Sequence, residues 1–231
     1  SGFLSYKDNV GEITNKGFEL DLRWRVFSTN KMQLYVNGNL AANKNRIEKI
    51  SEALKSYNKR VEDSYAQNAL IDRKRMLKFV EGASTTSIYA MRSLGIDPQT
   101  GKEMFISKDG TVGNKWIASE NVAVGNTEPK INGSISTNFY YRGLTLDLYF
   151  TYTYGRQQYN QTLQSKIENA NIEKNVDKRV FTDRWKNEGD ICQFKSLKDY
   201  RETTNPTTRF VQDDNTLTFQ SLSLGYELPD R

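Results

Sequence analysis

The stretch Phe18-Glu19-Leu20-Asp21-Leu22-Arg23-Trp24-Arg25-Val26 alternates without exception between apolar and charged side chains. Successive side chains of a β-strand face opposite ways, so this alternation gives an extended chain one apolar face and one charged face. With 36% hydrophobic residues in the chain, such a window arises by chance about once in a thousand. The stretch therefore predicts a strand whose two faces meet different surroundings.

The same period of two returns in four other segments, most clearly over Leu144–Tyr154, where Tyr149 is the one exception. We expect an all-β chain of about five antiparallel strands. The expected strands cover residues 17–27, 32–41, 131–141, 144–154 and 216–226.

The last strand carries a phase change. Leu217 and Phe219 are out of phase with Leu222 and the alternating apolar residues after it. One inserted residue would produce this shift, so we predict a β-bulge near Gln220 or Ser221.

The connections alternate between very short and very long. Ser28–Asn30 and Arg142-Gly143 are hairpin-sized, whereas residues 42–130 and 155–215 far exceed the usual limit of about 12 to 15 residues for structureless loops. Both short turns would lie at one end of an antiparallel sheet and both long segments at the other. We expect each long segment to fold around its own short helices.

Local signals inside the long segments support that expectation. Ile47, Ile50 and Leu54 have helical spacing, and Leu163 with Ile167 indicates a second short helix. Turn signals flank a predicted small hairpin at Glu103–Ser107, and Asp213-Asp214-Asn215 is expected to be a turn. The basic residues Arg73, Lys74, Arg75 and Lys78 are expected in a solvated loop, or against phosphate groups.

Composition excludes several classes of function. Lys and Arg number 33 against 28 Asp and Glu, and this dispersed charge of +5 argues for no nucleic-acid partner. Cys192 is the single cysteine and histidine is absent, which removes Cys/His chemistry. No metal-binding spacing is present, so we expect no enzyme, no metal and no cofactor. No apolar run approaches the roughly 20 residues of a membrane helix.

Strand length leaves two architectures open. A ten-residue strand is about 33 Å long, and at a tilt of about 45° it spans roughly 23 Å, the height of an outer-membrane apolar band. Aromatic residues gather near both expected strand ends, as the girdles of a transmembrane β-barrel do. Alternation alone is equally typical of a soluble antiparallel sheet with one wet face.

Three stretches carry a family resemblance: Asn9–Leu20, Ser87–Pro98 continued by Thr100–Glu103, and Leu222–Pro229. Together, in this order, they resemble the C-terminal barrel region of SusC/RagA-type TonB-linked outer-membrane proteins, the TonB-dependent receptors. The resemblance covers nearly the whole chain. It implies a partial antiparallel transmembrane β-barrel, with residues 42–130 and 155–215 as long extracellular loops.

The resemblance also implies a function and a place. Such proteins are nutrient importers of the Bacteroidetes outer membrane, with a plugged barrel of about 22 strands, energised by TonB and paired with a SusD-like surface lipoprotein. The cargo would be an oligosaccharide or a peptide. We expect the plug domain and the TonB-contacting region to lie outside this sequence, because the chain has too few strands to close a barrel.

Two groups of residues are candidates for contact with cargo. In a barrel, the charged face of the first strand and the polar side chains of the second would line the lumen. They are Glu19, Asp21, Arg23, Arg25, Tyr35, Asn37 and Asn39. They would contact cargo, contact the plug or only hydrate the wall. The loop candidates are Gln157, Gln158, Tyr159 and Asn160, which suit carbohydrate or peptide capture or anchoring at the interface.

The rival interpretation is a surface-exposed or secreted β-sandwich that binds glycan or protein without transporting it. A sandwich would bury the apolar strand face in its own core, whereas a barrel wall would present that face to outer-membrane lipid.

Overall fold

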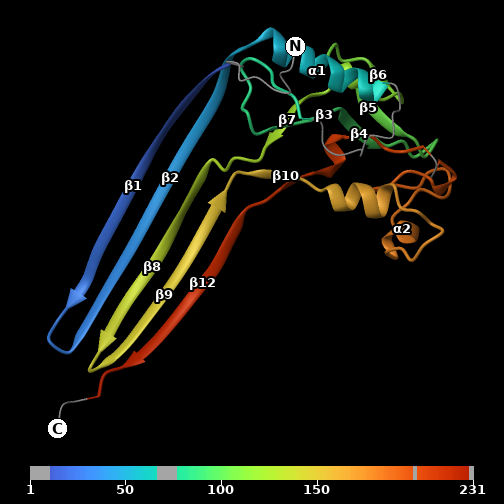
Figure 1. Ribbon diagram of the computed structural model, residues 1–231. Helices are drawn as coiled ribbons and strands as arrows, with labels where there is room; N and C mark the ends of the chain where they lie inside the picture. The colour runs from blue at the N-terminus through green and yellow to red at the C-terminus, as the bar shows by residue number, and fades with distance from the viewer. Residues whose placement is uncertain (1–10, 67–76, 200–201, 229–231) are drawn as a thin grey trace, which may run out of the picture. The chain divides into compact units, whose positions relative to one another are not determined.

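The computed structural model describes residues 11–66, 77–199 and 202–228; Figure 1 shows its strands and helices. Asn9, Val10 and Pro229 of the matching stretches, and the basic residues Arg73 to Arg75, lie outside the described residues. The chain divides into two compact units. The sheet unit comprises Thr14–Asn45, Glu128–Gln157 and Asp213–Arg231, and the insertion unit comprises Ser1–Ile13, Arg46–Thr127 and Gln158–Gln212.

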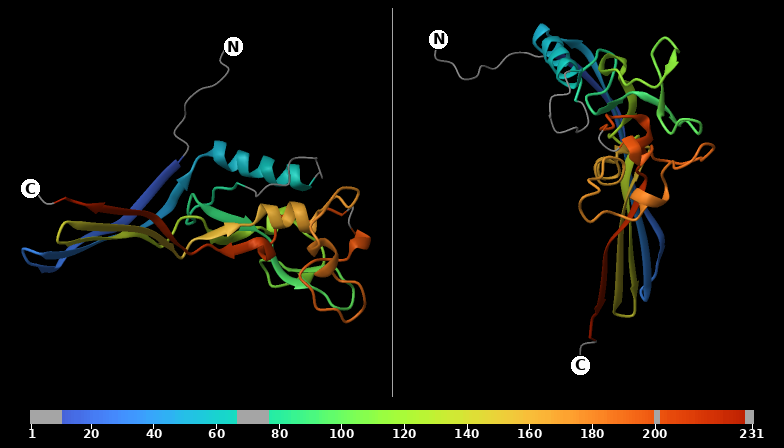
Figure 2. Two further views of the ribbon diagram at one scale, coloured as in Figure 1. Left: turned by 90° about the horizontal axis from the view of Figure 1, so that it is seen from below. Right: turned by 90° about the vertical axis from the view of Figure 1, so that its right-hand side faces the viewer.

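The sheet unit is built on one five-stranded sheet in the order β1-β2-β8-β9-β12. Its strands are β1 (Gly11–Ser28), β2 (Met32–Ile50), β8 (Ile131–Tyr141), β9 (Leu144–Tyr154) and β12 (Thr216–Tyr226). The pairs β2/β8, β8/β9 and β9/β12 are antiparallel, and Figure 2 shows the strands from two further sides. The chain is mostly β-strand with few helices, as the sequence predicts. The sheet is open, with β1 and β12 at its edges.

The turn between β8 and β9 fixes the register of the sheet. Arg142 and Gly143 have φ angles of 48° and 91°, the pair of positive values that a two-residue type I′ hairpin requires. Tyr141 therefore faces Leu144, and the pairing continues to Ile131 opposite Tyr154. The predicted bulge in β12 is confirmed, because the register with β9 shifts between Phe219 and Ser221.

Two strands extend beyond the expected ranges. β1 begins at Gly11 rather than near residue 17, and β2 continues to Ile50 rather than ending near residue 41. The helix expected from Ile47 onward is therefore wrong over its first residues. The backbone of Ile47 instead pairs with Gly82 and Ala83. Helix α1 (Glu52–Ala66) begins only after Ser51, whose hydroxyl accepts a hydrogen bond from the backbone NH of Leu54.

The insertion unit consists of short elements. Its strands are β3 (Ser87–Ala90), β4 (Arg92–Ile96), β5 (Glu103–Ile106), β6 (Val112–Gly113), β7 (Val122–Asn126), β10 (Gln157–Tyr159) and β11 (Val211–Asp213). Its short helices are η1 (Ala118–Glu120), η2 (Leu163–Glu168), α2 (Arg179–Thr182), η3 (Leu197–Asp199) and η4 (Thr208–Phe210). The predicted second helix is confirmed at Leu163 as a π-helical turn. The small hairpin predicted at Glu103–Ser107 is instead one strand, β5, in the middle of the three-stranded sheet β4-β5-β6.

Each long segment contains short helices, as expected, but the two segments also pack against each other and share one fold. Met91 of the first segment exchanges backbone hydrogen bonds with Pro206 and Thr208 of the second. Trp185 donates its indole NH to the carbonyl of Pro98 at 2.7 Å. Its ring packs so closely that a Cβ on Gly101 would lie 2.5 Å from it. Neither segment completes this packing alone.

A buried charge cluster joins the same two segments. Arg209 forms a two-pronged contact with Glu103, at 2.8 Å from Nε to Oε1 and 2.6 Å from Nη2 to Oε2, and its Nη2 lies 2.8 Å from Glu168 Oε1. The Glu103 and Glu168 side chains are only 5% and 0% exposed. Burial acts to lower the pKa of Arg209, but hydrogen bonds and charge from both carboxylates outweigh it and hold that pKa above its usual range.

A second buried arginine holds the end of η2. Arg184 donates to the backbone carbonyls of Ile167, Glu168 and Lys195, the last at 3.0 Å. Burial lowers the pKa of this guanidinium. Around it lies the apolar cluster of Ile167, Ala170, Val180, Phe194 and Phe210. The insertion unit thus combines an apolar core with paired charges.

We predict that Arg209→Met in the full-length protein destabilises the insertion unit by about 3 to 5 kcal/mol, because two buried carboxylates lose their partner. Limited proteolysis should then cut residues 158–212 at a lower denaturant concentration. The matched control is Arg179→Met, which removes an exposed ion pair to Asp177 in the same unit and should leave the cleavage profile unchanged. Equal protease resistance of the two variants would contradict a structural role for Arg209.

Candidate functional site

One face of the sheet carries a hydrogen-bonded row of polar side chains. The Asn37 amide donates to Asn138 Oδ1 at 3.0 Å and to Ser136 Oγ at 3.2 Å, and the Asn138 amide donates to Asp147 Oδ1 at 2.8 Å. These residues come from β2, β8 and β9, whose register sets them opposite one another. The row ends at the Asp147 carboxylate, which accepts from the Asn138 amide.

Arg23 and Tyr35 extend this polar face toward the sheet edge. The Arg23 guanidinium lies 5.3 Å from the centroid of the Tyr35 ring, a cation–π contact. The structure therefore brings together Arg23, Tyr35 and Asn37 of the predicted set. Asn39 Oδ1 instead accepts a hydrogen bond from the backbone NH of Ser134 at 2.8 Å, so this side chain supports the strand pairing.

The remaining predicted residues of the first strand, Glu19, Asp21 and Arg25, are exposed along β1. Asn138 and Asp147 were not among the candidates, although they are central to the row. The predicted turn at Arg142-Gly143 was the signal for Asn138 and Asp147, because a two-residue turn there sets residue 138 opposite residue 147.

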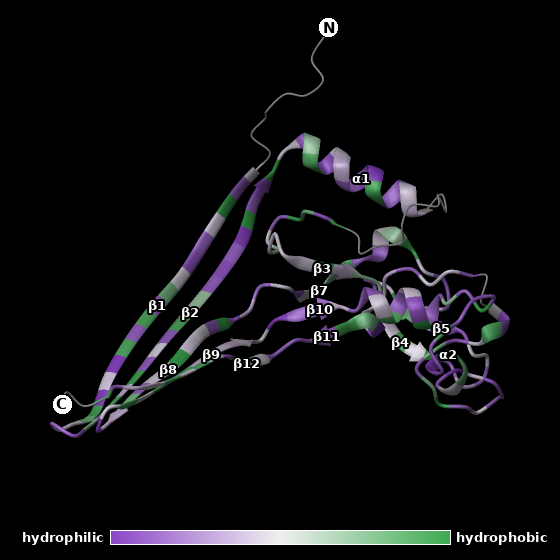
Figure 3. Cartoon of the chain, turned by 60° about the horizontal axis from the view of Figure 1, so that its bottom comes forward, coloured by the Kyte–Doolittle hydropathy of each residue, from purple (hydrophilic) through white to green (hydrophobic). Residues whose placement is uncertain are grey.

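The opposite face of the sheet is apolar. The register aligns Leu34, Phe139, Leu146 and Leu224 across four strands, and it pairs Phe150 with Phe219. On the edge strands Leu22 is 62% exposed and Leu224 is 65% exposed. Figure 3 shows the alternation of hydrophilic and hydrophobic residues along β1. Within the described residues of the sheet unit, no second layer covers this face.

Tyr152 crosses the sheet at Gly133. Its hydroxyl donates to the backbone carbonyl of Asn39 on β2 at 3.0 Å, although Tyr152 lies on β9. The ring passes over β8 where Gly133 has no side chain: a Cβ there would lie 2.6 Å from the Tyr152 hydroxyl and would overlap the Asn39 carbonyl oxygen. Gly133 is therefore needed for the Tyr152 side chain of β9 to cross β8 and hydrogen-bond to β2.

The loop candidates are engaged within their own segments. Gln157 donates to Asp213 Oδ1 at 3.1 Å, and Asn160 Oδ1 accepts from the NH of Leu163 at the start of η2. The Tyr159 ring packs 6.0 Å from Phe210, and burial raises the pKa of its hydroxyl far above the usual range. Gln158 lies between Gln157 and Tyr159 in β10. A cargo contact by these residues stays a prediction.

The turn predicted at Asp213-Asp214-Asn215 is instead a short link between two strands, since Asp213 ends β11 and β12 begins at Thr216. Asn215 Oδ1 accepts from the NH of Gly155 at 2.7 Å, and Asp214 pairs with Arg156. Within the described ranges, no group of three or more Asp, Glu or Cys side chains is placed to hold a metal ion. No helix in the described part of the chain is long and apolar enough to cross a bilayer.

Comparison with known proteins identifies a class that shares this fold. No protein-family profile matches the chain. A curated relative and several solved structures match instead, and all are described as receptors or transporters. The curated relative is a TonB-dependent receptor and the solved structures share the fold of this chain, and both findings agree with the resemblance seen in the sequence.

The particular relatives are as follows. TonB-dependent receptor P3 of Formosa agariphila is 22% identical over 247 residues, which is all of this chain and 23% of that protein. The RagAB peptide transporter matches 99% of this chain with 21% identity and a TM-score of 0.76, and its open-open state matches with 22% identity and a TM-score of 0.74. The chain spans about a quarter of the length of these relatives.

We predict that Gly133→Ala lowers the stability of the full-length protein by about 1 to 3 kcal/mol, since the new methyl group must displace backbone as well as the Tyr152 ring. Urea unfolding followed by the shift in gel mobility would measure it. The control is Gly113→Ala in β6, where an added Cβ meets nothing within 4 Å. Equal unfolding midpoints would show that the close approach at Gly133 is dispensable.

Proposed function

We propose that this chain forms part of the wall and mouth of a TonB-energised nutrient importer. In this proposal the five strands of the sheet unit span the outer membrane as one sector of a β-barrel, with the apolar face toward lipid and the polar face toward the lumen. The observation that carries the proposal is the single-layer sheet, whose two faces have opposite character and whose apolar side chains are exposed.

The same observation argues against the β-sandwich. A sandwich buries its apolar faces between two sheets about 10 Å apart, but the apolar face here has no second sheet over it within the described residues of its unit. Both edge strands also lack a neighbour on one side in the described sheet, and each unpaired backbone group would cost several kcal/mol in lipid. Further strands of a longer protein would pair with those edges.

The cargo in this proposal is an oligosaccharide or a peptide. The likeness to a structure called the RagAB peptide transporter favours a peptide. A SusD-like surface lipoprotein would cover the mouth, and TonB would act on a region outside this sequence. We further propose that the chain has no catalytic activity, since it contains no histidine and a single cysteine.

The insertion unit would face the cell exterior. Outer-membrane barrels have short periplasmic turns and long extracellular loops. In the sheet, the register puts both short turns at one end, where Met32 faces Tyr141 and Tyr141 faces Leu144. The long segments leave from the other end, where Ile131 faces Tyr154.

We predict opposite accessibility for adjacent residues of β1. In the assembled full-length protein with Cys192→Ser, a cysteine at Leu22 should react with a lipid-soluble probe and resist a water-soluble thiol reagent, and a cysteine at Asp21 should do the reverse. Leu22→Arg should cost about 2 to 4 kcal/mol near the bilayer midplane, while Asp21→Asn should be nearly silent. Protection of position 22 from both reagents would mean a protein core and would refute the membrane assignment.

We predict a matching result for topology. In the same Cys192→Ser background, Glu188→Cys, in an exposed loop of the insertion unit, should be labelled on intact cells by a membrane-impermeant maleimide. Lys31→Cys, in the short turn before β2, should be labelled only after the outer membrane is permeabilised. The reverse pattern would mean that the chain is inverted.

A further inference from the structure

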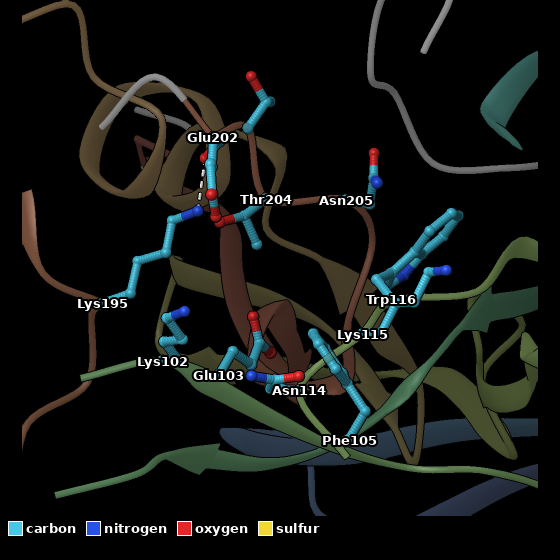
Figure 4. Close-up of a pocket in the computed structure, with 11 residues that line it drawn as sticks. Lys102, Glu103, Phe105, Asn114, Lys115, Trp116, Lys195, Glu202, Thr204 and Asn205 are labelled. Carbon is cyan, nitrogen blue, oxygen red and sulfur yellow. Dashed lines mark hydrogen bonds between the residues drawn. The ribbon is translucent and has the colours of Figure 1, made fainter. Parts of the chain in front are cut away.

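A pocket of about 220 Å³ lies inside the insertion unit, where the two long segments meet. Figure 4 shows its lining. Lys102, Phe105, Lys115 and Trp116 come from the first segment, and Lys195 with Thr203 to Asn205 from the second. None of the side chains predicted from the sequence as cargo contacts lines this pocket. Its volume suits one charged side group or a single sugar ring rather than a whole solute.

The net charge of the pocket is positive. Three lysines, Lys102, Lys115 and Lys195, line it together with two glutamates, Glu103 and Glu202. Glu103 contributes little negative charge, because Arg209 holds both of its carboxylate oxygens. Lys102 and Lys115 are exposed. A concave site with this excess attracts anions.

The pocket walls are held in place before any ligand arrives. Trp116 donates its indole NH to the Pro206 carbonyl at 3.0 Å, and its ring lies 5.8 Å from the ring of Tyr65. Lys195 is 8% exposed, and its ammonium donates to the backbone carbonyl of Glu202. The carbonyl of Lys195 in turn accepts from Arg184. A site that is ordered in advance loses less entropy on binding.

We propose that this pocket binds the carboxylate of an anionic solute, with the apolar part of that solute against Trp116 and Phe105. Lys102 and Lys115 would make the charge-assisted hydrogen bonds, and Lys195 would add fixed positive charge at the inner wall. The inference rests on the proposed import function, and it narrows the cargo to acidic peptides or uronic-acid oligosaccharides. These two sources present the same carboxylate to the same lysines.

The test is equilibrium binding to the full-length protein purified in detergent. One probe pair is a pentapeptide with two glutamates and its glutamine counterpart, and the other is trigalacturonate and its methyl ester. The acidic member of at least one pair should bind about tenfold more tightly than its neutral partner, and added salt should reduce the difference. The pair that shows the preference identifies the source of the carboxylate.

The test variant is Lys102→Gln with Lys115→Gln, which should lose about tenfold in affinity for the acidic probe and little for the neutral one. The control is Lys59→Gln with Arg60→Gln, which removes the same charge from exposed positions of α1 and should change affinity by less than about twofold. An unchanged melting temperature would show that both variants fold.

Two results would overturn the inference: equal affinity for the acidic and neutral members of both pairs, or an equal loss of affinity in test and control variants. Both are read from binding, so they do not depend on transport. Acidic probes that bind at the pocket but never enter cells would instead refute the import function and leave the pocket assignment intact. Uptake of neutral probes, with no preference for the acidic probes in binding, would overturn the pocket assignment and leave the import function intact.

Discussion

A sheet of one layer has no interior, and this constraint governs the sheet unit. Side chains on both faces remain outside any core, so every strand must suit two different surroundings at successive residues. The alternation along β1 and β9 is the direct result. The polar row from Asn37 to Asp147 and the apolar rows opposite it follow from that alternation once the hairpin at Arg142-Gly143 has set the register. Cross-strand contacts, such as that between Tyr152 and Asn39, take the place of a core.

The insertion unit follows the opposite rule. It encloses a core of Phe194, Phe210 and their neighbours, and it buries charges that would be too costly without partners. The two-pronged contact between Arg209 and Glu103 joins residues that are 106 positions apart in the sequence. This pairing connects the two segments through side chains that would be costly to bury alone. The described parts of the long insertions thus pack around a common core.

A sheet unit without a core and an insertion unit with one both fit the proposed importer. A barrel wall needs opposite faces and closed edges, which alternating strands and further neighbours supply. Recognition needs fixed groups in a concave setting, which strands alone do not offer. The pocket at the meeting of the two segments provides one fixed lysine, Lys195, two exposed lysines and aromatic walls.

The sequence by itself determined the class of fold, the strand pattern, the two short turns and the bulge in β12. These are local properties, since alternation and turn chemistry depend on neighbouring residues only. The sequence pattern placed the end of β2 too early, because the backbone of Ile47 pairs with residues 82 and 83. It also gave no sign that the two long segments pack together. Only the tertiary structure decided that Glu103 meets Arg209 and that Lys102 lines a pocket with Lys195. Contacts between residues so far apart depend on three-dimensional packing, which no local pattern records.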